Sequence, residues 1–527
     1  MPDHAHHSRH RTTGHGLTGK TRYVAEQAPR AAERVGAGAV VITSLTNAAA
    51  AEIGSRVDGL PDGNIGTLHS ICLRIGPHKG KPVADGPTQV KRFNRRTGYD
   101  VHALRGNDPY DTPVAVREHD LLSELALARS AMVPREQWSP DLQDFAHEWE
   151  AFKSENDAID YLDMIEGAPP EPPGKIMFVD EAQDLSALEV DLLHRWEDRL
   201  EHLVLVGDPD QALYTWRGAD PEQVFGHYDN RIVLSCSYRV PRQIQQAANR
   251  LIERLHEPER WEPTGEEGAV VDRHFPVDGV SRIVRPVLHE VLHERAQGMT
   301  TMLMATCSYM LDPFMKVLRE DGVPYHNPFA PGVAHFNPLS QDPAKLVALF
   351  QRGGTLSYGE VHTLTWQLSD GYFREGGYDW LRSKAQDKDE EGRPADWAAL
   401  EEAMVPDLVR VLRTGDGRAW AGMFPGGEVT WKSLDYPLRA MHEYRHGTLP
   451  SVLIGTIHSF KGAQADSVHV LGEIPPVQLR NHGGAIERLR HSPEHVRQFY
   501  VAMTRAEHKL TCWSTWKNSA DFGRHHY

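Results

Sequence analysis

Residues 175–184, KIMFVDEAQD, decide the fold. Four consecutive apolar residues run directly into Asp180 and Glu181. A short, uninterrupted apolar run predicts a strand that is buried on both faces, as in a parallel sheet. Carboxylates at its carboxyl end lie where open α/β sheets bind ligands, and there Asp180 can hold Mg²⁺ while Glu181 orients or deprotonates an attacking water. The alternative is a buried strand that ends in a solvated acidic turn.

A glycine-rich segment supplies the partner that these carboxylates need. Residues 14–21, GHGLTGKT, match G-x-x-x-x-G-K-[ST], in which backbone N–H groups surround phosphates, Lys20 reaches the β- and γ-phosphates and Thr21 binds Mg²⁺. The residues that follow have helical spacing, so a helix N-terminus would also face the phosphates. The predicted nucleotide-binding positions of this segment are Gly14, Gly16, Thr18, Gly19, Lys20, Thr21 and Arg22.

The same pattern requires a strand before the loop, and the residues that precede the loop are polar. Residues 1–13 read MPDHAHHSRHRTT, with hardly any apolar side chain. Three explanations stay open: residues 8–13 form a poor strand, the true start lies upstream, or the first strand is missing. Each of them would be expected to weaken nucleotide binding.

Polar residues follow other predicted strands. Thr46 comes shortly after the apolar run 39–43, and His69 lies in the segment NIGTLHS at 64–70. Hydroxyl and amide groups at strand ends and helix starts can hold a sugar-phosphate backbone. Ordinary helix capping by Ser44, Thr46 and Asn47 explains the local pattern equally well.

The strand predicted at 202–208 leads into a polar and aromatic segment. Gln211, just past the strand end, is placed to sense a γ-phosphate. Tyr214, Trp216 and Arg217 bring aromatic and guanidinium planes together. Such planes stack on unpaired bases, at about 1–3 kcal/mol per base. The alternative is that Trp216 fills the core.

Two segments interrupt this alternation of strands and helices. From about residue 74 to 167 the composition predicts a helical insertion, with helices near 118–132 and 142–165. Residues 336–447 predict a second, mostly helical insertion, whose charged run at 387–391 is expected to be a solvated face. Strands predicted at 231–234, 300–307, 452–458, 468–471 and 510–513, with a helix at 494–502, complete the α/β pattern.

Composition limits the class of protein. A chain of 527 residues should hold three or four domains, and no stretch approaches the roughly 20 apolar residues of a membrane span. The net charge of −16 counts against a nucleic-acid partner but does not exclude a local basic groove. The polar N-terminus does not resemble a secretory signal. Four dispersed cysteines without a CxxC pair predict a reducing cytoplasm, no disulfides and no cysteine-based zinc site.

The order of these motifs resembles superfamily-1 DNA helicases of the UvrD/Rep/PcrA type. The matching stretches are GHGLTGKTR, TSLTNAAAAEI, GTLHS, VDEAQD, VGDPDQALYTWRGA, SYR, GTIHSFKG and YVAMTRAEHKL. The resemblance implies an α/β fold with two RecA-like P-loop motor domains built on parallel sheets, each carrying a mainly helical insertion. The implied boundaries are 1–74 with 166–230 for the first motor domain, 75–165 for its insertion, 231–335 with 448–527 for the second motor domain, and 336–447 for its insertion.

The resemblance also implies catalytic roles. Glu181 would be the catalytic base and Gln211 the γ-phosphate sensor, while Arg239 and Arg505 would reach that phosphate from the second motor domain. Two arginines suit charge that spreads over a transferring phosphoryl group, and they make hydrolysis depend on domain closure.

Further contacts follow from the same resemblance. Beside the phosphate loop, the implied nucleotide contacts are Tyr238, Lys461 and Gln464, and Mg²⁺ would bind Thr21 and Asp180. The implied DNA contacts are Thr46, His69, Tyr214, Trp216, Thr456 and His458.

The chain departs from the family pattern at several positions. Leu45 replaces a base-stacking phenylalanine, Ala48 a lysine, Ser237 an asparagine and Gln464 a ribose-binding glutamate. The family's adenine-reading glutamine, which precedes the phosphate loop, has no counterpart here. These departures concern nucleotide selectivity and the grip on DNA more than hydrolysis.

The leading interpretation is an ATP-dependent DNA helicase that moves 3′-to-5′ on single-stranded DNA and couples hydrolysis in an inter-domain cleft to strand separation. It requires ATP and Mg²⁺, and its partners are single-stranded DNA and junctions of single- and double-stranded DNA. We expect a cytoplasmic monomer or weak oligomer. The alternative is an ATP-gated nucleic-acid-binding subunit of a larger complex, without processive unwinding. A fused helicase-nuclease is disfavoured, because no carboxylate-rich domain follows Arg505.

Overall fold

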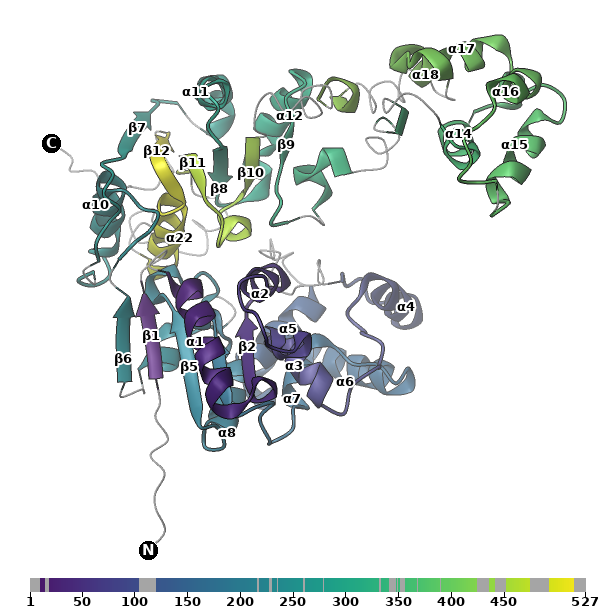
Figure 1. Ribbon diagram of the computed structural model, residues 1–527. Helices are drawn as coiled ribbons and strands as arrows, with labels where there is room; N and C mark the ends of the chain where they lie inside the picture. Colours follow the sequence, from purple (N-terminus) through teal and green to yellow (C-terminus); the bar gives the residue numbers. More distant parts are fainter. Residues whose placement is uncertain are drawn as a thin grey trace, which may run out of the picture. The chain divides into compact units, whose positions relative to one another are not determined.

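The chain forms two compact units, which we describe one by one (Figure 1). One unit comprises Met1–Arg282, Met304–Ser308 and Thr456–Tyr527, and the other comprises Ile283–Leu303 and Tyr309–Gly455. The computed structural model describes residues 10–14, 19–103, 120–215, 218–226, 230–234, 236–258, 261–277, 279–330, 333–340, 347, 349–350, 356–366, 368–388, 390–423, 436–440, 452–473 and 492–515.

The first sheet has six strands in the order β3-β2-β4-β5-β1-β6, and neighbouring strands run parallel. The strands are β1 His10–Gly14, β2 Val40–Ser44, β3 Ile65–Thr67, β4 Ile176–Val179, β5 His202–Gly207 and β6 Asn230–Leu234. In β4, Ile176 and Phe178 pack into one hydrophobic cluster while Met177 and Val179 pack into another. The apolar run that opens the sequence analysis is therefore a strand buried on both faces, as predicted.

Strand β1 answers the question of the polar segment before the phosphate loop. His10–Gly14 lies between β5 and β6 and pairs in parallel with both (Figure 1). Its register places Thr12 opposite Val206 on one side and Ile232 on the other. The polar segment thus forms a strand, which begins two residues later than the expected range 8–13. Because backbone groups bond on both edges, the strand forms without an apolar sequence.

Helices of this unit cover this sheet, form the first insertion or, in the case of the last two, contact the second sheet described below. They are α1 Lys20–Val35, α2 Asn47–Gly54, α3 Leu68–Ile75, α4 Pro87–Thr97, α5 Leu121–Ser130, α6 Pro140–Glu155, α7 Tyr161–Glu166, α8 Ala187–Glu197, α9 Pro221–Phe225, α10 Arg242–Ile252 and α22 Pro493–Met503. The first insertion is helical, as predicted, with an aromatic core in which the ring centroids of Phe93 and Trp149 are 5.0 Å apart.

One helix prediction in this insertion was wrong. The single helix expected near 142–165 is two helices, α6 and α7, separated by a turn in which Asp157 has φ 45°. The side chains of Asp160 and Asp163 each accept a hydrogen bond from the other's backbone N–H, which forms a capping box at the start of α7. This cap stabilises a new helix N-terminus where the apolar periodicity alone suggested continuity.

The second sheet also has six strands, in the order β7-β12-β11-β8-β10-β9. Strand β12 pairs in parallel with β7 and β11, and β10 pairs in parallel with β9. The strands are β7 Ala269–His274, β8 Thr301–Ala305, β9 Tyr325–His326, β10 Val452–Thr456, β11 Ala465–Leu471 and β12 Ala506–Ser514, and the helices α11 Val284–Ala296 and α12 Asp312–Glu320 belong to the same part of the chain. Two parallel sheets with flanking helices confirm the predicted fold class.

The second insertion has its own core. Its described helices are α14 Tyr358–Thr365, α15 Gly377–Gln386, α16 Trp397–Ala403, α17 Pro406–Thr414 and α18 Gly417–Gly422. Trp420 is fully buried, stacks on Phe350 with ring centroids 4.6 Å apart and donates its indole N–H to the Leu364 carbonyl at 3.1 Å. In the charged run, Asp387, Lys388 and Glu391 are exposed, as expected of a solvated face.

Two simpler features complete the description. Every helix in the described ranges is too short or too polar to span a bilayer. All four cysteines, Cys72, Cys236, Cys307 and Cys512, are free thiols, as predicted.

Candidate functional site

The phosphate-loop residues lead directly from β1 into α1. Gly19 has φ +75° and precedes Lys20, the first residue of α1. The positive φ of Gly19 favours a glycine, and a Cβ there would also lie 3.1 Å from a ring carbon of Tyr238, closer than an ordinary van der Waals contact. Thr21 follows on α1, whereas Gly16 and Thr18 lie outside the described residues.

Lys20 is ready to bind an anion. Its side chain is buried, and its Nζ has no hydrogen-bond partner among the residues that the structure describes. The ammonium interacts electrostatically with the carboxylates of Asp180 and Glu181, but its burial without a hydrogen bond carries a desolvation cost that a bound phosphate would help to offset. The amides at the start of α1 point the same way, because a helix N-terminus favours anions.

Asp180 follows the end of β4, and its carboxylate interacts electrostatically with Lys20. Its backbone N–H bonds the Thr43 carbonyl at 2.8 Å, and within the described part of the chain its buried Oδ1 has no hydrogen-bond partner. Burial and the adjacent Glu181 carboxylate raise the pKa of Asp180 to about 7, although Lys20 opposes this. Asp180 interacts electrostatically with Lys20, the residue before Thr21, and its buried oxygen has spare capacity, so Asp180 and Thr21 fit the oxygen ligand set that Mg²⁺ would need.

Glu181 is held as a carboxylate. It has a left-handed backbone with φ 55°, and its side chain accepts one hydrogen bond from the Gln183 amide and forms an ion pair with Lys461 at 3.1 Å. Burial alone would raise the pKa of Glu181, but Lys461 and Lys20 outweigh it and lower the pKa below its usual range. An uncommon backbone conformation at a strand end is typical of functional positions.

Gln211 and Arg505 meet at the end of β5. The Gln211 amide donates to Asp208 at 2.6 Å, and its oxygen accepts a hydrogen bond from the Arg505 guanidinium at 2.9 Å. Arg505 is fully buried and also donates to the Val501 carbonyl at 2.9 Å. Burial lowers the pKa of Arg505 to about 10, so the side chain stays cationic at neutral pH. The two predicted γ-phosphate contacts thus lie side by side.

Arg239 and Tyr238 follow β6. Arg239 donates to the Ala463 carbonyl at 3.0 Å, and burial, followed by the charge of Arg505, lowers the pKa of Arg239 well below its ordinary value. Tyr238 is 66% exposed, and the Arg22 guanidinium lies 5.6 Å from its ring centroid. An open aromatic face beside Gly19 is available for a flat ligand.

The four residues of the 452–473 segment that were predicted to contact nucleotide or DNA differ in their burial and in their partners. Lys461 binds the carboxylates of Glu181 and Asp184, and burial lowers the pKa of Lys461 to about 8 against the raising effect of Glu181. Gln464 is exposed. The buried Thr456 hydroxyl accepts the Ser459 N–H at 3.2 Å. Burial lowers the pKa of His458 to about 4, which leaves its ring neutral.

The remaining predicted DNA contacts are engaged within the protein. Thr46 caps α2 by accepting the Ala49 N–H at 3.1 Å, so the capping explanation describes this structure. His69 is buried, 3.8 Å from a Glu189 oxygen. Tyr214 is 4% exposed, with its ring centroid 5.9 Å from that of His458. Trp216 and Arg217 lie outside the described residues, and a strand-binding role stays a prediction for all of these residues.

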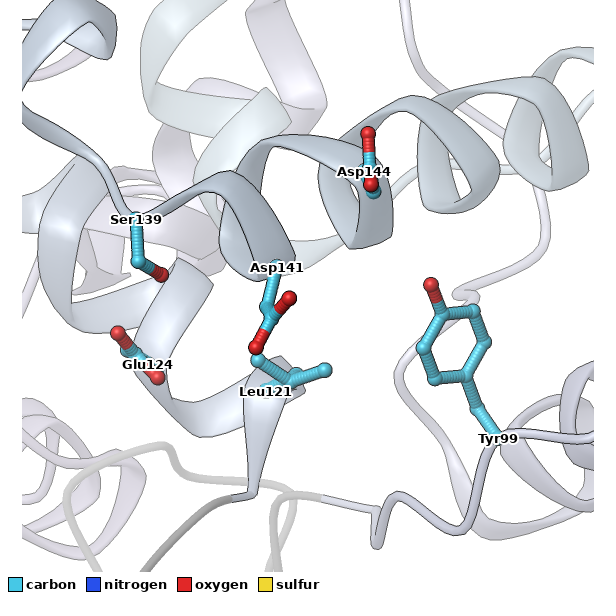
Figure 2. A pocket seen from close by; sticks show the side chains of 6 residues that line it. All are labelled: Tyr99, Leu121, Glu124, Ser139, Asp141 and Asp144. Atoms are coloured by element: carbon cyan, nitrogen blue, oxygen red, sulfur yellow. The ribbon is translucent and has the colours of Figure 1, made fainter.

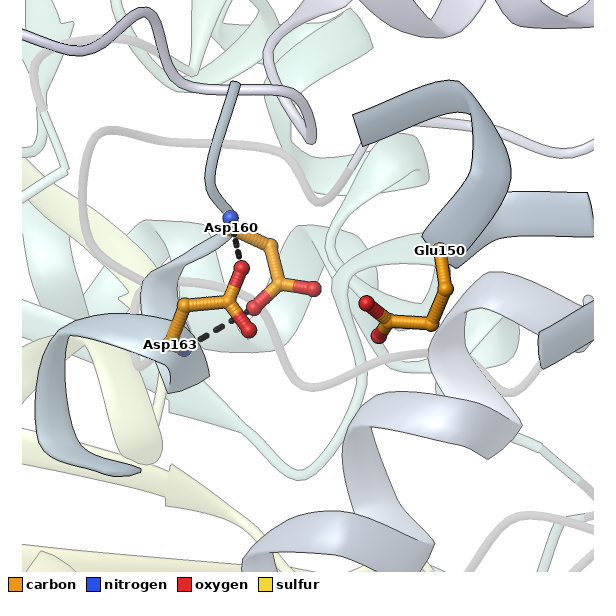
Figure 3. A group of neighbouring side chains, drawn as sticks. All are labelled: Glu150, Asp160 and Asp163. Carbon is orange, nitrogen blue, oxygen red and sulfur yellow. Dashed lines mark hydrogen bonds between the residues drawn. The ribbon is translucent and has the colours of Figure 1, made fainter. Parts of the chain in front are cut away.

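Two acidic groups lie away from this site. Glu150, Asp160 and Asp163 have oxygens within 4.8 Å of one another (Figure 3). Lys153 and Arg129 pair with these carboxylates at 2.7–3.0 Å, so the group forms an ion-pair network. Figure 2 shows a hollow lined by Tyr99, Leu121, Glu124, Ser139, Asp141 and Asp144. Its acidic lining does not suit a phosphate.

Comparison with known proteins identifies the family. The AAA domain family matches residues 6–217, and the UvrD-like helicase C-terminal domain family matches residues 436–517. The chain belongs to the superfamily-1 helicases of the UvrD/Rep/PcrA type. The two matched domains contain the phosphate loop, the acidic strand and helix α22 with Arg505 just after its end, which are the parts that carry the site.

Individual helicases of this family share limited stretches with the chain. The ATP-dependent DNA helicase PcrA of Bacillus subtilis is 25% identical over 277 residues, covering 45% of this chain and 36% of PcrA. PcrA of Staphylococcus epidermidis is 25% identical over 259 residues, covering 42% and 34% of the two chains. The ATP-dependent DNA helicase Rep of Buchnera aphidicola is 35% identical over 81 residues, covering 14% and 13%. The chain thus matches about a third of the length of these PcrA helicases.

The family motifs also contain residues that the sequence analysis did not single out. Asp184, the last acid of DEAQD, binds Lys461 through one oxygen and accepts the Leu213 N–H through the other at 3.0 Å. Asp208 holds the Gln211 amide, and the Gln183 oxygen accepts the Asp208 N–H at 3.0 Å. Their charge and position at strand ends were visible in the sequence, but their partners come from distant segments.

Proposed function

We propose that the protein is an ATP-dependent DNA helicase that translocates 3′-to-5′ on single-stranded DNA and works at junctions of single- and double-stranded DNA. The observation that supports this most is the hydrogen bond between Arg505 and Gln211, in the same unit as the unpartnered ammonium of Lys20. A guanidinium, a sensor amide and a phosphate-binding lysine are the groups that phosphoryl transfer requires. The relatives are named ATP-dependent DNA helicases, which supports the choice of DNA.

In this proposal the chain's own residues divide the work of hydrolysis. Lys20 and the α1 N-terminus bind the β- and γ-phosphates, and Thr21 with Asp180 holds Mg²⁺, which neutralises charge between those phosphates. Glu181 accepts a proton from the attacking water. Gln211 orients that water, while Arg505 and Arg239 stabilise charge on the transferring group. Tyr238 stacks on the adenine.

We also propose how hydrolysis is coupled to DNA. The motor domains are 1–74 with 166–230 and 231–335 with 448–527, and they close over ATP when both arginines engage the γ-phosphate. Closure and opening then shift the strand past Tyr214 and Trp216, while Thr46, His69, Thr456 and His458 contact its backbone. Lys461 and Gln464 lie on the segment 452–473, which would link ATP hydrolysis to movement of the strand.

A second candidate is a nucleotide-gated binding subunit that does not unwind DNA. Two features favour it: Leu45 is a buried aliphatic residue where the family has an aromatic one, and the Tyr214 ring is buried. Neither residue offers an open face for a base. In this candidate ATP would switch the affinity for a nucleic-acid partner without steady movement.

One assay separates the two candidates. ATP hydrolysis is measured with and without single-stranded DNA, together with displacement of a strand from duplexes that carry a 3′ or a 5′ tail. The helicase proposal requires DNA-stimulated hydrolysis and displacement on the 3′-tailed duplex, with both lost in Lys20→Ala. Stimulated hydrolysis without displacement on either duplex would favour the gated subunit. Hydrolysis unaffected by Lys20→Ala would overturn the nucleotide site itself.

A further inference from the structure

Lys461 joins the catalytic carboxylate to the segment that carries Tyr214. Its side chain is 9% exposed, and its ammonium lies 3.1 Å from Glu181 Oε2 and in contact with Asp184 Oδ2. The other oxygen of Asp184 accepts the backbone N–H of Leu213, the residue before Tyr214, at 3.0 Å. Lys461 therefore bridges two carboxylates, of which one belongs to the hydrolysis site and the other fixes the Tyr214 segment.

The aromatic ring itself lies against the same lysine. The Lys461 Nζ is 5.8 Å from the centroid of the Tyr214 ring, within the range of a cation–π contact. His458, three residues before Lys461, covers the ring as well, with centroids 5.9 Å apart. Because Tyr214 is 4% exposed, a base can stack on it only if the ring or its neighbours move. Such movement changes the surroundings of Lys461.

The ion pair has a direct consequence for Glu181. Oε2 of Glu181 receives both the Gln183 amide and the Lys461 ammonium, so donors from the protein occupy this oxygen. A carboxylate acts as a base through a free lone pair that reaches the water. An ammonium at the same oxygen competes with that water, and a buried ion pair does not dissociate without a compensating interaction.

From this geometry we propose that Lys461 is a positioning residue that restrains Glu181 while no strand is bound, and that a base at Tyr214 and His458 releases the restraint. The inference rests on the proposed strand-dependent hydrolysis of ATP and names the residue that makes hydrolysis depend on the strand. DNA then raises the rate because it binds better to the state in which Lys461 has left Glu181.

The test measures the ATP hydrolysis rate at saturating ATP, without DNA and with saturating single-stranded DNA. Lys461→Met removes the ammonium and keeps the length of the side chain. We expect its DNA-free rate to rise and its stimulation ratio, the rate with DNA divided by the rate without, to fall about fivefold or more, the size of a typical coupling between two sites. Lys461→Arg keeps the charge and should retain the wild-type ratio within about twofold.

A second variant keeps the test valid if Lys461→Met does not fold. Asp184→Asn retains an oxygen for the Leu213 N–H but removes the charge that holds Lys461 on the Tyr214 side. Its stimulation ratio should also fall. The matched control is Lys175→Met, at an exposed pair with Glu201 of 3.1 Å, which should leave both rates unchanged. Melting temperatures of all variants verify folding.

The possible outcomes separate this inference from the proposed function. If Lys461→Met, or Asp184→Asn in its place, lowers both rates by the same factor and leaves the ratio unchanged, Lys461 serves hydrolysis alone and the inference is overturned. If wild-type protein shows no stimulation by DNA and no strand displacement, the proposed function fails first. Stimulation in the wild type that is lost in Lys461→Met and kept in Lys461→Arg supports both.

Discussion

The groups assigned to the nucleotide and the groups assigned to the strand differ in how far they are satisfied inside the protein. On the nucleotide side, Lys20 Nζ and Asp180 Oδ1 are buried and lack hydrogen-bond partners within the described residues. On the strand side, Thr46 caps a helix and Tyr214 is buried against His458. Orphaned buried groups are costly, whereas satisfied groups must first be freed. The proposed nucleotide site is therefore preformed, whereas the proposed strand contacts would have to rearrange before they bind DNA.

The first way to challenge this comparison is at Arg505. Arg505→Ala removes the guanidinium that donates to Gln211, and we expect DNA-stimulated hydrolysis to fall about 10³-fold or more, as for other arginines that act on a transferring phosphoryl group. The measurement is the hydrolysis rate at saturating ATP. Arg195→Ala, at the exposed pair with Asp191 on α8, is the control and should be neutral. A loss of less than about tenfold would mean that Arg505 only supports the fold of its surroundings.

The second test addresses the base. Glu181→Gln keeps the shape of the side chain but removes the charge, so hydrolysis should fall about 10²–10⁴-fold. Binding of a fluorescent ATP analogue should persist, because Lys20 and α1 are intact. Glu201→Gln, which changes an exposed acid in the same way, is the control. Parallel loss of binding and turnover would contradict a preformed nucleotide site.

A smaller effect is expected on the strand side at Trp216. If Trp216 stacks on a base, Trp216→Ala should reduce unwinding about tenfold, the equivalent of the lost stacking energy, and reduce ATP hydrolysis by less than about twofold. Single-turnover strand displacement and steady-state hydrolysis are compared on the same DNA. An equal decrease in the two rates would argue against a stacking role and in favour of core filling.

The smallest effect distinguishes capping from strand contact at Thr46. Thr46→Ala removes the cap of α2 and should lower the free energy of unfolding by about 1 kcal/mol, measured by urea denaturation. Thr46→Ser retains the capping oxygen and should remain close to the wild type. If capping is the main role, affinity for single-stranded DNA stays constant. Weaker DNA binding at unchanged stability would restore the strand-contact interpretation.

The sequence was sufficient where the structure depends on local pattern. The apolar run of β4 and the glycine-lysine pattern before α1 predicted a buried strand and a helix start, and both are present. The sequence was less informative where the structure depends on pairing with distant segments. The polar strand β1 forms because β5 and β6 supply backbone partners on both of its edges. No periodicity of its side chains predicts this strand.

In the candidate site, too, local motifs could be predicted from the sequence, whereas contacts between distant segments could not. Motif residues such as Gln211 and Arg505 were found from the sequence, but their mutual hydrogen bond depends on tertiary packing. The burial of Tyr214 and the sharing of Lys461 by Glu181 and Asp184 were not foreseeable, because each joins segments far apart in the chain. The break between α6 and α7 was missed since a capping box outweighed helical periodicity there.

The position of β1 bears on how the protein should be handled. This strand ends in the phosphate loop, and its two neighbours lead to Gln211 and to Tyr238 with Arg239. A displacement of His10–Gly14 would therefore reach the phosphate loop and the residues proposed to sense the γ-phosphate and to stack on the adenine. If the proposed function holds, affinity tags joined close to His10, or trimming through Thr13, would lower the affinity for ATP although the proposed nucleotide contacts had not changed.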